Sequence, residues 1–312
     1  MSFRYAPGVL RQVRSLDAPE IGVAYRAIDL RAPLLRVGVQ SGHGIASDYG
    51  LLDRATPFVR DVRRVCLSVL LEGEGRFDEG DRRLWLRPGE AVLSDASRGG
   101  TEAYAGPRSR VLVLEWASGT LGPSADVDGL VVRLGEREIA ALARAADAFD
   151  GPQPVQAVLE ILAVMRSAGV ALERVDVGDL TEGSDPRDLA LALALDGPLS
   201  NLASFPAIDD VVDELGWSQR LVHRRIAALA SRYGFAFDTW RALLHHLRLA
   251  MALRLASAGA TTELIAKKTG YRSPVALCHA FAKAGLPSPG TLAREARRDV
   301  LDAWATHLRD RS

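Results

Sequence analysis

The sequence is poor in cysteine, in aromatic residues and in long apolar runs. Its 312 residues include two cysteines, Cys66 and Cys278, and 6% of positions are aromatic. Two distant cysteines are too few for a disulfide framework or a thiolate metal site, so we expect both to be reduced and buried. No run of about 18 apolar residues occurs, and the first residues lack the apolar core of a secretory signal. We therefore expect a soluble, cytoplasmic protein that does not enter a membrane.

Histidine is also scarce in the first two thirds of the chain. Of the six histidines, His43 alone lies within residues 1–200. A site that binds a divalent metal through imidazoles brings three or four nitrogen and oxygen ligands together. Such a cluster cannot be assembled there, so we expect no metal, no other cofactor and no catalytic residue.

The balanced net charge hides a division along the chain. Residues 201–312 carry 16 Lys and Arg against 10 Asp and Glu, whereas residues 1–200 carry 23 against 29. A basic tail joined to an acidic body is typical of a chain in which one domain meets a polyanion. An ordinary solvated surface can carry the same charge, so this pattern favours nucleic acid without establishing it.

Residues 34–116 alternate between short apolar stretches and turn residues. The clearest stretches are 34–40, 65–71, 83–86, 91–93, 101–104 and 111–116. Turn signals every 8–12 residues predict an antiparallel sandwich or barrel. In its turn spacing, segment 73–95 resembles the core hairpins of a cupin-type jelly roll, although the histidines of cupin enzymes are missing.

Between residues 132 and 196 the apolar period becomes helical. Segments 139–146 and 155–165 have this spacing, and 189–195 is a third short apolar segment after a helix-start signal at 184–186. These helices either pack against the barrel or offer a face, formed by Val155, Leu159 and Leu162, to a second copy of the chain. Both alternatives stay open at this point.

Residues 208–234 have the pattern of two helices joined by a turn. The first helix is predicted to end at Gly216, and Ser218 caps the second. Val222, Ile226 and Leu229 then form the buried stripe of the second helix. Its exposed side carries Arg220, His223, Arg224 and Arg225. One such helix pair is a weak motif, because any helical domain contains similar turns.

The same pattern recurs over residues 262–285. Here Gly270 ends the first helix and Ser273 caps the second. The exposed side of this second helix carries Val275, His279, Ala282 and Lys283, and Arg272 precedes it. The amphipathic segment 237–257 between the two pairs would be about 30 Å long as a helix, close to the ~34 Å between successive major grooves on one side of B-DNA. Both second helices could then enter adjacent grooves.

Residues 200–298 resemble the DNA-binding domain of AraC/XylS-type transcription regulators. In the first unit the matching residues are Gly216, Ser218 and Arg224. Around the second unit they are Arg248 and Ala252 before it, Ile265, Ala266, Gly270, Tyr271, Ser273, Leu277 and Phe281 within it, and Ser288 and Pro289 after it. Departures from the family pattern are Val212 in place of a small residue, a longer segment 226–234, His279 in place of a frequent arginine, and a displaced glycine at 285. We therefore expect a divergent member whose second unit reads DNA sequence less strictly.

The resemblance implies an α+β architecture in three parts. Residues 1–130 would form a cupin-like β jelly roll that binds a small-molecule effector, residues 131–199 a helical linker and dimerisation segment, and residues 200–312 an all-α domain with two helix-turn-helix units. A homodimer would bind double-stranded promoter DNA, and regulators of this type can also contact RNA polymerase. The predicted DNA contacts are Ser218, Arg220, His223, Arg224, Arg225, Arg272, Ser273, Val275, His279 and Lys283.

Four residues of predicted strands are candidates for effector contact. They are Trp85, Arg87, Tyr104 and Trp116. Large aromatic residues in small barrels are more often core residues than ligand contacts, so this set is the less specific one.

Two other classes of protein compete with this interpretation. One is a cupin-type metal-dependent enzyme with a helical regulatory tail, which the missing histidine cluster disfavours. The other is a binding protein whose helical tail meets another protein. In that case the exposed Arg220, Arg224 and Arg225 would have no evident purpose.

Overall fold

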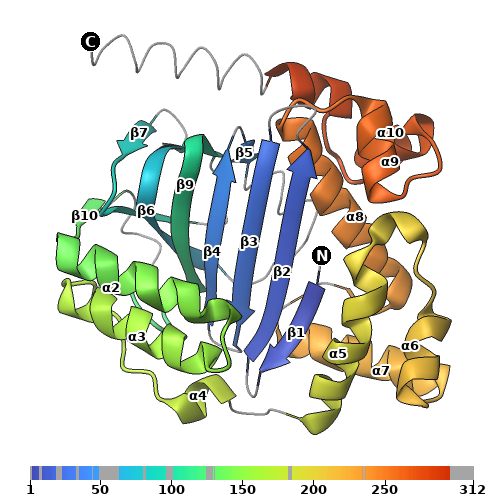
Figure 1. The fold of residues 1–312 in the computed structure, drawn as a ribbon, viewed down its shortest axis with the longest axis horizontal. Helices are drawn as coiled ribbons and strands as arrows, with labels where there is room; N and C mark the ends of the chain where they lie inside the picture. The colour runs from blue at the N-terminus through green and yellow to red at the C-terminus, as the bar shows by residue number, and fades with distance from the viewer. Residues whose placement is uncertain are drawn as a thin grey trace.

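The structure is a computed structural model. It describes residues 2–6, 9–18, 23–32, 35–43, 45–48, 63–79, 82–95, 101–123, 129, 131–181, 185–233, 235 and 237–295. In this part of the chain, a twisted sheet carries helices on one face, and a second group of helices lies beyond the edge strand β1 (Figure 1). None of the described helices combines the length and the apolar character needed to cross a bilayer.

The described strands form one 10-stranded sheet in which every pair is antiparallel. The strands are β1 (Ser2–Ala6), β2 (Val9–Ala18), β3 (Val23–Arg31), β4 (Leu35–His43), β5 (Ile45–Asp48), β6 (Arg64–Glu79), β7 (Arg82–Leu86), β8 (Glu90–Asp95), β9 (Thr101–Ala117) and β10 (Val131–Arg133). Their order is β1-β2-β3-β4-β9-β6-β8-β10, with β5 on β9 and β7 on β6. The predicted antiparallel sheet is confirmed, and it also includes the N-terminal strands β1 to β3. Its closure into a jelly roll stays a prediction.

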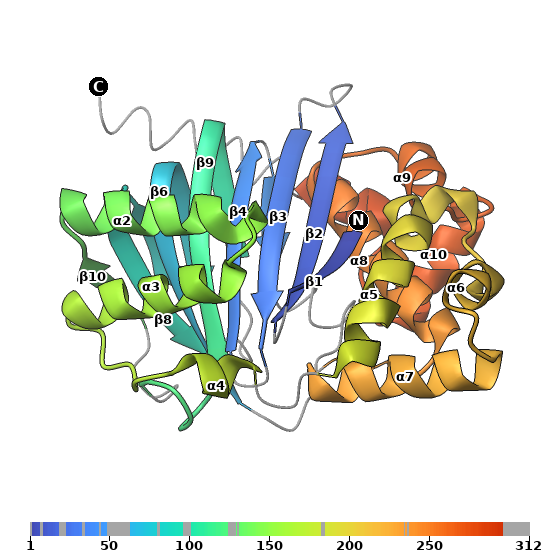
Figure 2. The ribbon, with the colours of Figure 1, turned by 60° about the horizontal axis from the view of Figure 1, so that its bottom comes forward.

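One face of the sheet forms the larger apolar core with the helices of the central segment. These helices are α2 (Glu136–Asp147), α3 (Pro154–Ser167) and α4 (Val177–Thr181). Alternate residues of β6, Val65, Leu67 and Val69, point into this core. Figure 2 shows α2 and α3 lying across the strands. The helical period predicted for this segment therefore reflects packing on the sheet.

This packing bears on the predicted self-association face. Leu162 is fully buried in the core, and Val155 and Leu159 are partly buried against it. The chain's own sheet thus covers much of the face, and we correct the prediction for Leu162, which has no surface left to offer a second copy. Dimerisation itself stays a prediction.

The opposite face of the sheet carries a row of buried charges. Arg36 donates to Asp29 through Nε at 2.9 Å and to Glu115 through Nη1 at 2.6 Å. Arg14 pairs with Asp29 and Arg64 with Glu115, so the row ties together β2, β3, β4, β9 and β6. Burial alone would raise the pKa of Asp29, but the neighbouring guanidiniums outweigh it and hold the pKa well below its usual range.

The remaining helices belong to the C-terminal part. They are α5 (Pro186–Ser200), α6 (Ile208–Leu215), α7 (Gln219–Arg232), α8 (Trp240–Ser257), α9 (Thr262–Thr269) and α10 (Pro274–Lys283). Two of them end at glycines in the left-handed region, α6 at Gly216 with φ 63° and α9 at Gly270 with φ 74°. Two begin at serine caps, whose hydroxyl oxygens accept from backbone N–H groups at 3.3 Å for Ser218 and 3.1 Å for Ser273. These helices begin and end at the cap residues that the sequence predicts.

The C-terminal helices share a core with the second face of the sheet. Leu249 and Leu253 of α8 belong to the same buried cluster as Tyr25 and Val113 of the strands. Arg254 of α8 is also buried there, with its guanidinium 5.3 Å from the centre of the Tyr25 ring. The sheet and the helix pairs are therefore in direct contact through α8.

Candidate nucleic-acid interface

Helix α7 presents a narrow basic surface. Val222, Ile226 and Leu229 are buried under the helix. Arg220 and Arg224, one turn apart, are exposed on the opposite side, and His223 is half-buried at the edge of this surface. Two guanidiniums on a capped, exposed helix can each offer a pair of parallel N–H donors.

Arg225 does not belong to this surface, which corrects the prediction that it contacts DNA. Its Nη1 lies 2.5 Å from Asp185 Oδ2 and 3.9 Å from Asp188 Oδ1, both on or next to α5. Arg232, two turns further along α7, pairs with Asp188 as well. Because these side chains clamp α7 against α5, the guanidinium of Arg225 is turned away from the exposed side. Asp188 lies in an apolar segment of the sequence, which could have indicated a buried ion pair.

The electrostatics of this clamp differ between its two carboxylates. The backbone N–H of Arg187 and then the guanidinium of Arg225 lower the pKa of Asp185. Burial raises the pKa of Asp188 in spite of the nearby arginines. The carboxylate of Asp185 is therefore stabilised by its partners, whereas that of Asp188 carries the cost of burial.

Helix α10 presents the corresponding surface of the second pair. Val275 is 64% exposed, and His279 and Lys283 are exposed with it, as are Ala282 and Arg272. Leu277 and Phe281 are buried on the other side. Ser273 is half-buried and its hydroxyl accepts from the Ala276 N–H. This surface combines the apolar side chains of Val275 and Ala282 with the single hydrogen-bond donors of His279 and Lys283, whereas α7 presents two arginines.

The sequence interpretation missed one exposed residue on α10. Cys278 is an exposed free thiol and lies between Val275 and Ala282 on successive turns of the helix. Cys66, by contrast, is buried in the sheet. The spacing from Val275 was sufficient to place Cys278 beside this surface, but its small, apolar character suggested the core.

The turn between α9 and α10 is fixed by a neighbouring segment. A Cβ atom added to Gly270 would collide with the backbone oxygen of Leu202, in the short helix η3 (Leu202–Ser204). Arg248 of α8 donates to that same oxygen at 3.0 Å, and its guanidinium lies 5.1 Å from the centre of the Phe205 ring. Close backbone contact therefore sets the direction in which α10 leaves the turn.

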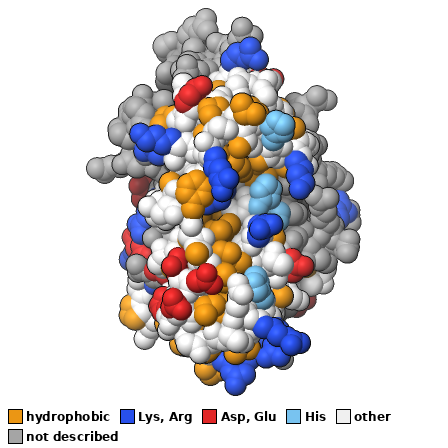
Figure 3. Space-filling model, turned by 90° about the vertical axis from the view of Figure 1, so that its right-hand side faces the viewer, with side chains coloured by type: hydrophobic (Ala, Val, Ile, Leu, Met, Phe, Trp, Pro, Cys, Tyr) orange, Lys and Arg blue, Asp and Glu red, His pale blue; other side chains and the backbone are white. Residues whose placement is uncertain are grey.

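Figure 3 shows the face of the molecule formed by the C-terminal helices. Lys, Arg and His side chains are spread over it and are mixed with hydrophobic ones. The described histidine side chains are His223, His245, His246 and His279. They lie on α7, α8 and α10.

The four predicted effector contacts do not line one pocket. Trp116 is buried in the core beneath α2 and α3. It pairs with Val65 and Tyr104 pairs with Gly75, ten positions further along β6, which corresponds to a separation of at most about 33 Å. Trp85 is half-buried on β7 and Arg87 is exposed beyond its end. The side chain of Tyr104 lies outside the described residues. The prediction of a single site from all four is therefore corrected, because both ends of one long strand cannot reach the same ligand.

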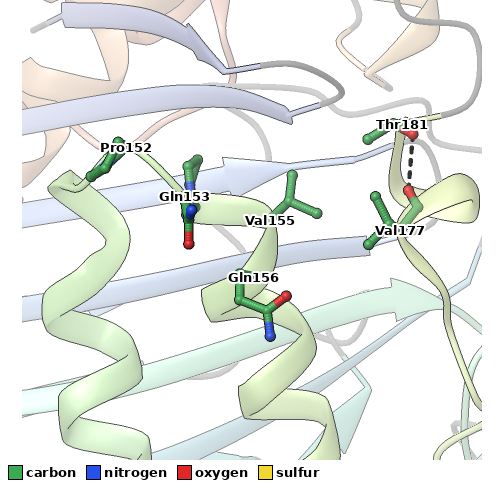
Figure 4. Close-up of a pocket in the computed structure, with 7 residues that line it drawn as sticks. Pro152, Gln153, Val155, Gln156, Val177 and Thr181 are labelled. Carbon is green, nitrogen blue, oxygen red and sulfur yellow. Dashed lines mark hydrogen bonds between the residues drawn. The ribbon is translucent and has the colours of Figure 1, made fainter.

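A hollow of about 350 Å³ lies instead where α3 and α4 begin. It is lined by Pro152, Gln153, Pro154, Val155, Gln156, Val177 and Thr181. Figure 4 shows the two glutamines and the exposed Val177 around it, with the Thr181 hydroxyl donating to the Val177 carbonyl at 2.9 Å. None of the predicted effector residues borders this hollow.

Neither the protein-family models nor the curated proteins give a match to this sequence. Among solved structures, ToxT from Vibrio cholerae is similar with a TM-score of 0.33 and 12% identity, over 83% of this chain and 98% of ToxT. CuxR, an AraC-like transcriptional activator, is similar with a TM-score of 0.30 and 15% identity, over 96% of this chain and 88% of CuxR. The cupin domain of an XRE-family regulator from Enterobacter cloacae gives 0.21 and 13%, over 34% of this chain and 95% of that domain. Such low TM-scores transfer no function, which has to be inferred from the residues of this chain.

Proposed function

We propose that this protein is a sequence-specific DNA-binding transcription regulator of the AraC/XylS type, without catalytic activity. One observation carries the proposal: two capped helices with exposed, donor-bearing sides, α7 and α10, stand on either side of the connecting helix α8. The 18 residues of α8 correspond to about 27 Å, which approaches the ~34 Å between successive major grooves. The two exposed helices can therefore address adjacent grooves of one duplex.

The two units would read DNA by different chemistry. Arg220 and Arg224 can each present two donors to guanine O6 and N7, and a good bidentate pair provides ~1–3 kcal/mol of discrimination. Val275 and Ala282 can touch thymine methyl groups, while His279 and Lys283 offer single donors. The first unit would then contribute most of the sequence specificity.

We further propose that a small-molecule effector acts through the N-terminal sheet domain. The second sheet face packs against α8, so a ligand held there could alter how the helix pairs are presented. A ligand shifts such an equilibrium only by its difference in affinity for the two arrangements. Calorimetric titration of candidate effectors with and without DNA tests the coupling, and an effector with equal affinity in both cases would refute it.

A homodimer would add a second half-site and raise affinity through effective concentration without new base contacts. We propose RNA polymerase as a further partner of this protein. Sedimentation velocity of the full chain at tens of micromolar tests the dimer, and a monomer bound to a single half-site would refute it.

The central test is selection of target DNA from a random duplex library with the full chain, followed by binding assays on the selected duplex and on a scrambled one. Replacing Arg224 by Ala should weaken binding to the selected duplex by roughly 1–3 kcal/mol and relax one base position. The matched control is Arg137→Ala, an exposed arginine on α2, on the far side of the sheet. Selection that enriches no sequence would overturn the proposal, and an equal loss on both duplexes would reduce Arg224 to a phosphate contact.

A further inference from the structure

The connecting helix α8 carries positive charge only. Its 18 residues include three arginines and two histidines but no aspartate or glutamate. The second half of the helix is buried almost all round, so the first half alone offers a surface. Arg241, His245 and Arg248 fall one turn apart along this surface, at i, i+4 and i+7. Arg241 is exposed and the other two are half-buried.

The described groups that act on His245 are all basic side chains. They are His246, whose ring centre lies 5.8 Å away, Arg248 on the same helix, and Lys283 at the end of α10. Burial and then these neighbours lower the pKa of His245. No carboxylate is among the described groups that act on the pKa of His245, so a bound anion would offset the positive charge of these neighbours.

This surface lies between the two helices proposed to enter DNA. Lys283 links it to α10, and α8 follows directly after α7 in the chain. Figure 1 shows α8 between α7 and the pair α9 and α10. A duplex that spans both helices would therefore pass over the first half of α8 with its backbone.

We propose that Arg241 and His245 form a third DNA contact, to backbone phosphates between the two grooves entered by α7 and α10. This inference rests on the proposed function. Arg248 is excluded from the contact because its guanidinium already donates to Leu202 O and stacks on Phe205. A phosphate at His245 offsets the surrounding positive charge, so the imidazole takes up a proton when DNA binds.

The contact has three measurable signatures. A phosphate contact contributes about 0.9 to the slope of log affinity against log salt, so its loss lowers the ratio of affinities at 50 and 200 mM salt about threefold. It carries no sequence information, so its loss weakens selected and scrambled duplexes by the same factor. Proton uptake at His245 makes the affinity higher at pH 5.5 than at pH 7.5.

The test uses the full chain, a fluorescent duplex selected as above and a scrambled duplex, with Arg241→Gln, His245→Gln and the control Arg137→Gln. Arg241→Gln should show the threefold change in salt ratio on both duplexes, and Arg137→Gln should show none. His245→Gln should flatten the pH dependence between 5.5 and 7.5. Arg241 is exposed, so its variant retains the fold even if His245→Gln does not.

Two results would separate the inference from the proposed function. If the wild-type chain binds DNA and Arg241→Gln keeps its affinity and salt slope on both duplexes, the α8 contact is refuted and the proposed function stands. An acidic protein partner on α8 would also give this result. If the wild-type chain binds no duplex at any salt concentration, both proposals fail.

Discussion

The two left-handed glycines that end α6 and α9 allow a matched test of how the second helix pair is held. Gly216 and Gly270 have similar φ angles, 63° and 74°. They differ in what a Cβ atom would meet: nothing within 4 Å at Gly216, but the backbone of Leu202 and Ala203 at Gly270. Alanine at each position isolates this difference.

The magnitudes follow from the geometry. A left-handed alanine costs roughly 1–2 kcal/mol, and the reduced freedom of the unfolded chain returns about 0.4–1 kcal/mol. Gly216→Ala should therefore lower the free energy of unfolding by about 1 kcal/mol. Gly270→Ala adds an overlap with rigid backbone, which costs a further ~1–3 kcal/mol, and it displaces α10 from η3.

Urea unfolding of the two variants, followed by circular dichroism, gives the comparison, and DNA affinity gives a second measure. We expect Gly270→Ala to be the less stable variant by at least about 1 kcal/mol and to lose DNA affinity, while Gly216→Ala keeps most of it. Equal destabilisation of the two variants would show that the contact with Leu202 does not fix the turn, and the reasoning would fail.

Three further predictions concern the buried charges and the DNA-facing surface. Asp29→Asn should destabilise the fold at pH 7 by ~3–5 kcal/mol, because it removes the buried carboxylate that pairs with Arg14 and Arg36. Since the folded-state pKa of Asp29 is lowered, its contribution is complete above the unfolded-state pKa of about 4 and declines at lower pH. Urea unfolding at pH 7 and pH 3 should therefore give a smaller difference at pH 3, and a constant difference would contradict the assignment. N-ethylmaleimide should modify Cys278 and spare the buried Cys66 in the native protein, and it should abolish DNA binding unless DNA is present during the reaction. Mass spectrometry follows the modification, and full affinity of the modified chain would remove α10 from the interface. His279→Arg should tighten DNA binding by supplying a bidentate donor, and a loss of binding in a gel-shift assay would contradict the groove-facing position of residue 279.

The helix boundaries could be predicted because they depend on neighbouring residues. Ser218 and Ser273 each cap the amide group three positions ahead, and Gly216 and Gly270 supply local left-handed turns. Strand stretches such as 65–71 could be predicted for the same reason, since alternation is visible in a short window. The buried stripes of α7 and α10 follow from this local information.

The misses depend on contacts between residues that are far apart in the sequence. Arg225 was predicted to contact DNA because its ion-pair partner Asp185 lies 40 residues earlier. A local sequence pattern does not reveal such a partner. Strands β2 and β3 carry Arg14, Asp29 and Arg31, whose charges conceal the apolar alternation until the pairing across the sheet is known. The four candidate effector residues could not be grouped into one site because β9 is 17 residues long, which puts Tyr104 and Trp116 at opposite ends of one element.

Helix α8 has its two halves in different hydrophobic cores. Trp240, Leu243 and Leu247 pack with α7, whereas Leu249 and Leu253 pack with α9, α10 and the sheet. A continuous helix anchored in this way fixes both the distance between α7 and α10 and the rotation of α10 relative to α7. One extra base pair between two half-elements rotates the second by about 34° around the duplex, since a turn takes 10–10.5 base pairs. For a DNA-binding protein in which α8 fixes this geometry, the spacing between half-elements would be as strict a requirement as their sequence.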